Sequence, residues 1–162
     1  MKHILYFFAH HLVILPALLV SYVIADIESD GDRLTAFLSF IVLMLISTTV
    51  GFIIKHIVRK KRPPLSIEMF KPRGKYAFPS GHALNTATVS AFIYLQNHTL
   101  GLISFLCAII ISLARVKSHV HDKADVLWGF IFGTLIGFAC TSFIIKMVIT
   151  FLIVHNTTVP IY

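Results

Sequence analysis

Charged side chains are scarce in this sequence: Asp, Glu, Lys and Arg make up 13% of the 162 residues, whereas hydrophobic residues make up 57%. Soluble globular domains carry about twice that share of charge, so the composition excludes a water-soluble domain and indicates a membrane protein. The sequence also has no internal repeat, no low-complexity segment and no alternating pattern that would predict β-strands. We therefore expect an all-α fold.

Cysteine is almost absent as well. Cys107 and Cys140 are the two cysteines of the chain, and each lies within an apolar run. Thiols in such surroundings behave as small hydrophobic side chains. The pair therefore predicts neither a disulfide nor a metal site.

The few charges are unevenly distributed. Acidic residues number seven against fourteen Lys and Arg, and eight of those fourteen fall between Lys55 and Lys75. A basic cluster of this kind indicates nucleic acid, anionic lipid or a phosphorylated substrate as the partner. Four of the seven acids lie in one short loop: Asp26, Glu28, Asp30 and Asp32.

Long apolar runs account for most of the chain. A helix that crosses a bilayer needs about 20 apolar residues. The runs predict a polytopic membrane helical bundle with about five transmembrane helices, which form a single membrane-embedded domain over residues 1–162. The expected spans are 4–25, 34–54, 80–97, 99–114 and 124–145. For the first span a secretory signal peptide is the alternative, since Val23-x-Ala25 suits a cleavage site, but its length and the pair His10-His11 favour a retained helix.

The basic cluster starts where the second span ends. A helix that continues to about Arg62 would place Lys55, Arg59 and Arg62 on one face, by the i, i+3, i+4 spacing. Pro63 would then end this helix. We expect residues 65–78 to form an irregular loop.

A Pro-Ser-Gly turn precedes the third span. Pro79 breaks the preceding structure, Ser80 is a suitable N-cap, and an apolar run follows. A helix N-terminus presents free N–H groups to anions. Gly81 lets a ligand approach the backbone, and His82 adds a titratable group. The turn therefore predicts an anion-binding site.

With five spans, successive loops alternate between the two sides of the membrane. The loops 55–79 and 115–123 then share one side, and the acidic loop 26–33 lies on the other. Ionisable residues near a bilayer are costly and mark functional sites. We expect an active site at this membrane interface, with contributions from Lys55, Arg62, His82, Arg115, His121 and Asp125.

These residue types suit phosphoryl transfer. Arg, Lys and helix N–H groups bind phosphate and stabilise charge on its oxygens, so three cations with the backbone of Ser80 and Gly81 can act without a metal. One histidine can attack phosphorus as a neutral imidazole while the other donates a proton to the leaving oxygen. Asp125, four residues after His121, can fix the tautomer of that ring and leave its other nitrogen free to attack.

Three motifs in this order resemble the signature of the type 2 phosphatidic acid phosphatases: Lys55-x6-Arg62-Pro63, Pro79-Ser80-Gly81-His82 and Arg115-x5-His121-x3-Asp125. Members of this family are integral-membrane lipid phosphatases, related in fold to soluble vanadium haloperoxidases. The resemblance implies that His121 is the nucleophile that forms a phosphohistidine, that Asp125 is its partner, and that His82 is the general acid. It also implies that no metal or cofactor is required, and that the phosphate is bound by Lys55, Arg62, Ser80, Gly81 and Arg115.

Two features depart from the family pattern. Ala114 stands where the third motif usually begins with Ser, so one hydroxyl contact is missing. The chain also has about five expected spans, where many members have six.

The expected function is hydrolysis of a lipid phosphomonoester or pyrophosphate by a multi-pass protein of a bacterial inner (cell) membrane. Its partners would be the lipid substrate and the bilayer, not nucleic acid. The alternatives are a lipid phosphotransferase of the same family, a catalytically silent lipid-binding or transport relative, and a small subunit whose basic loop docks on anionic lipid or another protein. Candidate lipids are phosphatidic acid, phosphatidylglycerol phosphate, a polyprenyl pyrophosphate and a lipid A phosphate.

Overall fold

The computed structural model describes residues 13–27, 30–62 and 74–158. In chain order its helices are α2 (Ile14–Ala25), α3 (Asp30–Val58), α4 (Gly81–Gln96), α5 (His98–Lys117) and α6 (Lys123–Thr158). The described part contains one isolated β-bridge, between Lys61 and Tyr76, and no strand. The predicted all-α fold is confirmed. Three sequence predictions lie outside the described residues: the start of the first span at 4–12, the helix stop at Pro63, and the loop over 65–73.

Each of the five predicted apolar runs contains a helix within the described residues, the first from Ile14 onwards. Three helical stretches are long and apolar enough to cross a bilayer: Asp32–Val58, His98–Lys117 and Lys123–Phe151. Helix α4 has 16 residues, which at 1.5 Å per residue is about 24 Å, somewhat less than a hydrocarbon core of about 30 Å. These lengths and compositions define a multi-pass membrane protein.

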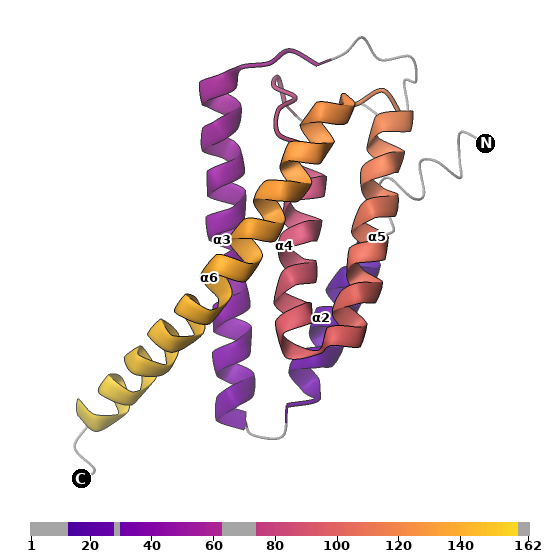
Figure 1. The fold of residues 1–162 in the computed structure, drawn as a ribbon. Helices are drawn as coiled ribbons and strands as arrows, with labels where there is room; N and C mark the ends of the chain where they lie inside the picture. Colours follow the sequence, from indigo (N-terminus) through magenta and orange to yellow (C-terminus); the bar gives the residue numbers. More distant parts are fainter. Residues whose placement is uncertain (1–12, 28–29, 63–73, 159–162) are drawn as a thin grey trace.

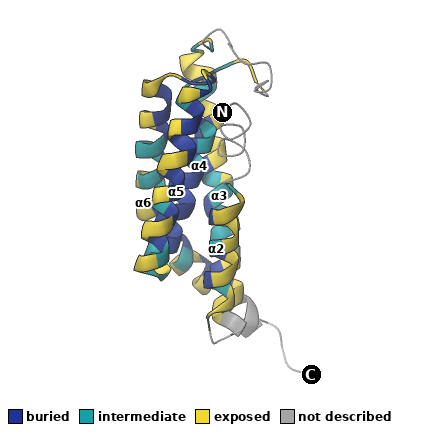
Figure 2. Ribbon diagram, turned by 90° about the vertical axis from the view of Figure 1, so that its right-hand side faces the viewer, coloured by how far each residue is buried: buried dark blue, intermediate teal, exposed yellow. Residues whose placement is uncertain are grey.

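Helix α4 lies at the centre of the bundle and contacts the other four helices, most extensively α6 and then α5 (Figure 1). Buried residues gather towards this centre, and exposed residues cover the outer faces (Figure 2). Large apolar side chains are common on that outer surface, among them Leu45, Leu106 and Phe143. An apolar exterior of this extent suits contact with lipid rather than water.

A stripe of glycines brings α6 into close contact with α4. Gly129, Gly133 and Gly137 lie four residues apart on one face of α6, as small residues do where membrane helices pack closely. A Cβ atom at Gly133 would lie 2.1 Å from the carbonyl oxygen of Leu84, and one at Gly137 would lie 2.4 Å from Cβ of Ala91. The predicted close packing is confirmed, and its partner is α4.

Replacing Gly133 with alanine should therefore destabilise the bundle, because the obstructing atom belongs to backbone that cannot move aside. We expect the apparent Tm in detergent to fall by about 10 °C, corresponding to about 3 kcal/mol of overpacking. Gly51→Ala is the matched control, since a Cβ there would meet only a methyl group of Leu84 at 3.5 Å. Equal Tm values for the two variants would contradict the packing argument.

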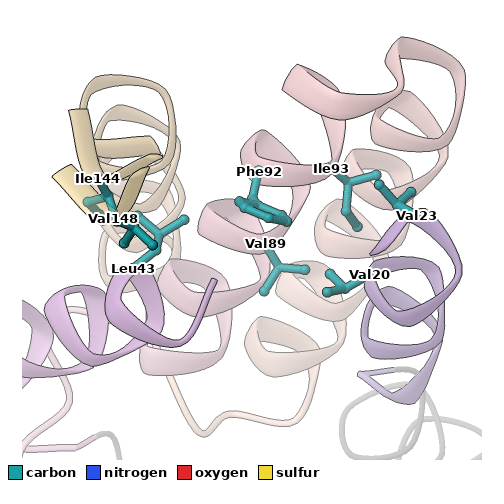
Figure 3. Packing of buried hydrophobic residues seen from close by; sticks show 8 residues of the cluster. All are labelled: Val20, Val23, Leu43, Val89, Phe92, Ile93, Ile144 and Val148. Carbon is teal, nitrogen blue, oxygen red and sulfur yellow. The ribbon is translucent and has the colours of Figure 1, made fainter. Parts of the chain in front are cut away.

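The hydrophobic core is formed by side chains from four helices that meet around the second half of α4 (Figure 3). Phe92 is fully buried at its centre, and the ring of Phe40 packs against it at a centroid distance of 5.4 Å. The buried cluster consists of Val20, Val23, Leu43, Val89, Phe92, Ile93, Ile144 and Val148. The first half of α4, which carries the predicted anion site, thus lies outside this apolar core.

The end of α3 differs from the sequence prediction. The helix stops at Val58 and does not continue to Arg62. Arg59 adopts a left-handed backbone with φ of 51°, and its N–H donates to the carbonyl of Lys55 at 3.0 Å, which is the αL termination motif. The proposed shared helical face of Lys55, Arg59 and Arg62 is therefore wrong. Local capping geometry ended the helix one turn before the proline.

The end of α5 is a Schellman motif that directs the chain towards His121. His119 is left-handed with φ of 55°, its N–H donates to the carbonyl of Val116, and the N–H of Val120 donates to the carbonyl of Arg115. The side chain of Val120 is fully buried, as a hydrophobic residue at this position of the motif commonly is. The turn places the next residue, His121, inside the protein with only 3% of its surface exposed.

Candidate active site

The C-terminal ends of α3 and α5 and the N-terminal ends of α4 and α6 lie at one end of the bundle (Figure 1). The C-terminal end of α2 and the N-terminal end of α3 lie at the other end. The structure thus places the two basic segments together and the acidic connection opposite them, as the sequence predicted. All the predicted site residues belong to the first end: Lys55, Arg62, Ser80, Gly81, His82, Arg115, His121 and Asp125.

His121 and Asp125 form a buried pair. Nδ1 of His121 lies 3.7 Å from Oδ2 of Asp125, and Asp125 has no exposed surface. The same Oδ2 accepts the backbone N–H of Asp122 at 3.1 Å, which holds the carboxylate across the first turn of α6. The expected proximity of the two side chains is present, although His121 itself precedes the helix.

The hydrogen bonds around His121 define its tautomer. Nη1 of Arg62 lies 3.2 Å from Nε2 of His121. A guanidinium can only donate, so Nε2 must be the accepting nitrogen and the ring proton must be on Nδ1, which faces Asp125. Nε2 is therefore the unprotonated nitrogen, and its lone pair accepts from Arg62 in this structure.

The surroundings of His121 also keep it uncharged. Burial, first, and the positive charges nearby together lower its pKa to about 2. Those charges are on Arg62, Arg115, Lys55 and His82. We expect a neutral imidazole at physiological pH, because burial and the neighbouring cations both disfavour the charged form of the ring.

Arg62 connects the first and third motifs even though it is not helical. Its Nη1 also donates to the carbonyl of Val120 at 3.2 Å, and its Nε donates to the carbonyl of Gly74 at 3.0 Å. The guanidinium is thus held beside Nε2 of His121. An anion bound by Arg62 would lie next to that nitrogen.

Several buried donors at this end have no hydrogen-bond partner within the described part of the chain. Nε and Nη1 of Arg115 are in this group, and only 5% of the residue is exposed. Oγ of Ser80 is also buried and unpaired there. Each such group costs about 1–3 kcal/mol, so native proteins keep them chiefly where a ligand satisfies them. Arg115 belongs to α5, whereas Ser80 is the N-cap residue of α4, so the two unpaired groups are contributed by different elements.

The N-terminus of α4 is fixed by two neighbouring elements. The backbone N–H of Ser80 donates to the carbonyl of Asp125 at 2.8 Å, and the ammonium of Lys55 donates to the carbonyl of Pro79. Ser80 occupies the N-cap position as predicted, but its hydroxyl makes no capping hydrogen bond. Within the described residues the N–H of Gly81, the first residue of α4, makes no backbone hydrogen bond, so it can donate to an anion.

Lys60 lies in the site but was not among the residues predicted from the sequence. Its ammonium lies 2.6 Å from Oδ1 of Asp125 and 2.8 Å from Oδ2 of Asp122. No spacing rule distinguishes it from Arg59 and Lys61, which flank it. The early end of α3, which only the backbone geometry reveals, turns its side chain towards α6.

Metal ligands do not cluster in this region. Within residues 13–27, 30–62 and 74–158, no three His, Cys, Asp or Glu side chains lie close enough to hold a metal ion. The role of metal is therefore a matter for experiment.

These observations define a class: multi-pass helical membrane proteins with histidines, arginines and lysines gathered at one end of the bundle. The sequence model of the PAP2 superfamily matches residues 36–148. The chain belongs to the PAP2 superfamily.

Two curated relatives are similar over the region of the motifs. The chain is 27% identical over 107 residues to the undecaprenyl-diphosphatase of Sulfolobus acidocaldarius, an alignment that covers 62% of this chain and 52% of the relative. It is 28% identical over 102 residues to phosphatidylglycerophosphatase B of Bacillus subtilis, with 56% and 49% covered. The chain thus spans about half the length of the curated relatives it matches.

A solved structure has the same fold. The crystal structure of the first transmembrane PAP2 type phosphatidylglycerolphosphate phosphatase, from Bacillus subtilis, superposes with a TM-score of 0.61. The match covers 91% of this chain and 76% of that chain, at 23% sequence identity. The bundle described above is therefore the fold of a transmembrane PAP2 protein.

Proposed function

We propose that this protein is a membrane-embedded lipid phosphatase that works through a phosphohistidine on His121 and requires no metal. The observation that carries the proposal is the set of unsatisfied buried donors beside a neutral histidine. Arg115 presents two such nitrogens, and Arg62 already donates to Nε2 of His121. A phosphate group would satisfy the donors and lie against the nucleophile.

In the proposed complex the substrate phosphate replaces Nε2 of His121 as the acceptor for Arg62. Arg115, Lys55 and the N–H groups at the start of α4 bind its remaining oxygens. Charge stabilisation and positioning are the main demands of phosphoryl transfer, and three cations with a helix N-terminus meet both. Burial strengthens each of these interactions because water screens them less.

The reaction then proceeds in two steps. Nε2 of His121 attacks phosphorus, the bond between phosphorus and the leaving oxygen breaks, and His82 gives its proton to that oxygen. A water molecule next attacks the phosphohistidine, releases inorganic phosphate and returns a proton to His82. Asp125 holds the Nδ1 proton of His121 in both steps and stabilises the charge that develops on the ring.

The substrate class follows from what the relatives are named for. One is a phosphatase of undecaprenyl diphosphate and the other of phosphatidylglycerophosphate. For the present chain we propose a lipid phosphomonoester or diphosphate as the substrate. The protein would act on it in a bacterial inner membrane. The apolar exterior beside the site suits a substrate whose tail remains in the bilayer.

The direct test is phosphate release by the purified protein in detergent from four lipids: phosphatidic acid, phosphatidylglycerol phosphate, a polyprenyl diphosphate and a lipid A phosphate. We expect release from at least one, at a rate that EDTA changes by less than about twofold, because cations of the chain provide the charge stabilisation. Complete loss in EDTA with recovery in magnesium would contradict the metal-independent mechanism. Transfer of phosphate to a second lipid without release would instead identify a phosphotransferase.

A further inference from the structure

Among the described residues, the ion pair with Lys60 is the shortest contact that the carboxylate of Asp125 makes. Oδ1 of Asp125 lies 2.6 Å from the ammonium of Lys60, within the distance of a charge-assisted hydrogen bond. Oδ2 is directed differently, towards the N–H of Asp122 at 3.1 Å and Nδ1 of His121 at 3.7 Å. The two oxygens thus have separate partners, and the orientation of the carboxylate is determined from both sides.

The carboxylate is also fully buried, whereas Lys60 is only partly so. None of the surface of Asp125 is exposed, against 34% of the Lys60 side chain. A buried carboxylate without a counter-ion takes up a proton, since its charged form has lost its hydration. The ammonium of Lys60 is that counter-ion, and Lys60 is not one of the residues proposed to bind phosphate.

The backbone around Lys60 makes this contact specific. Arg59 turns the chain at the end of α3, and the carbonyl of Lys60 then accepts the N–H of Ala77 at 2.8 Å. The neighbouring residues Lys61 and Tyr76 form the single bridge of the described chain. Lys60 is thereby held between the segment that leads to Pro79 and the first turn of α6.

We propose that Lys60 is a positioning residue for this active site: its ammonium holds the carboxylate of Asp125 in the orientation in which Oδ2 faces Nδ1 of His121. This inference rests on the proposed role of His121 as the nucleophile. Lys60 touches neither the phosphate nor the reacting nitrogen. Its effect reaches the reaction through Asp125, which selects the tautomer that leaves Nε2 free.

The electrostatic surroundings of Lys60 agree with this role. Desolvation lowers the pKa of Lys60, but its hydrogen bonds to Asp122 and Asp125 more than offset this, so the net shift is upward. The charged and titratable groups around the His121 ring come from every element packed against it: Lys55 of α3, Arg62 of the following segment, His82 of α4, Arg115 of α5 and Asp125 of α6. Of these, only Asp125 is an acidic side chain, so its orientation decides whether an acceptor faces Nδ1 of His121.

The first test needs no turnover. Nitrogen NMR of ¹⁵N-histidine-labelled protein in detergent, with the His121 signals assigned by their loss in His121→Asn, reports which ring nitrogen carries the proton. We expect a single Nδ1–H tautomer in the wild type and in Lys61→Met, whose exposed side chain is the matched control. In Lys60→Met we expect a mixture of the Nδ1–H and Nε2–H tautomers, because the carboxylate is no longer held in place. A His121 spectrum unchanged in Lys60→Met would overturn the proposal.

The second test uses the reaction. Lys60→Met should lower kcat by about 100-fold, the cost of a slightly misplaced reacting group, while KM changes by less than about threefold. Lys60→Arg, which keeps the positive charge, should recover most of the loss. If Lys60 acts through Asp125, adding Lys60→Met to Asp125→Asn should cost little more than Asp125→Asn alone. Additive losses, or loss of the folded protein in Lys60→Arg as well, would assign Lys60 a merely structural role.

These outcomes are distinguishable from failure of the proposed function. An inactive wild type with the expected NMR pattern would reject the phosphatase but retain the Lys60–Asp125–His121 arrangement. If the wild type is active and Lys60→Met leaves both kcat and the His121 spectrum unchanged, the phosphatase is retained and the role of Lys60 is rejected.

Discussion

Replacing His121 with alanine is expected to abolish turnover with every substrate. Without Nε2 no phosphoenzyme can form, and removal of an essential nucleophile costs on the order of 10⁴-fold or more in kcat. The ring is almost fully buried between Arg62 and Asp125, so a water molecule in its place would lack both the position and the nucleophilicity. Initial rates with a lipid phosphate and with p-nitrophenyl phosphate measure the effect.

The matched control is His98→Ala. His98 is an exposed histidine at the first position of α5, at the opposite end of that helix from the site. We expect the activity of this variant to remain within about twofold of the wild type, as is usual for surface substitutions distant from a site. Residual activity of His121→Ala above about one hundredth of the wild type would contradict the assignment of the nucleophile.

Replacing His82 with alanine is expected to have an effect that depends on the leaving group. A lipid alkoxide is a poor leaving group and needs a proton, so general-acid catalysis should be worth about 10²–10⁴-fold for the natural substrate. p-Nitrophenolate scarcely needs a proton, and its release should slow by less than about tenfold. His82 is the second residue of α4, and its charge is close enough to lower the pKa of His121.

The comparison of the two substrates within one variant controls for changes in folding or binding. A dependence on the leaving group in His82→Ala, with none in His121→Ala, separates the acid from the nucleophile. Equal losses with both substrates in His82→Ala would show that His82 does something other than protonate the leaving oxygen.

Much of the fold could be predicted from the sequence, because it depends on composition, on long apolar runs and on the spacing of the glycines. The five apolar runs became helices, the acidic and basic segments lie at opposite ends, and the glycine stripe at Gly129, Gly133 and Gly137 packs against α4. These features are determined by hydrophobic length and by the lack of a Cβ atom. Both are properties of the residues themselves and need no knowledge of the tertiary contacts.

The details that sequence reasoning missed depend on single backbone dihedrals. Arg59 and His119 adopt left-handed conformations that glycine or asparagine usually provides, and neither residue type signals a helix end. Because α3 ends at Val58, Arg62 reaches His121 from the non-helical segment that follows, and Lys60 turns towards Asp125. The spacing of the motif identified Arg62 but could not distinguish Lys60 from the cations beside it.

The most direct measurement is rapid quenching of the purified protein during turnover of ³²P-labelled p-nitrophenyl phosphate. The quench should be alkaline detergent, because the nitrogen–phosphorus bond of phosphohistidine is labile in acid. We predict labelled protein at the earliest times, with a burst of p-nitrophenol of matching size. The label should be on the peptide that contains His121, and the His121→Ala protein should carry no label. Turnover without labelled protein at any time, or a label on another residue, would contradict it.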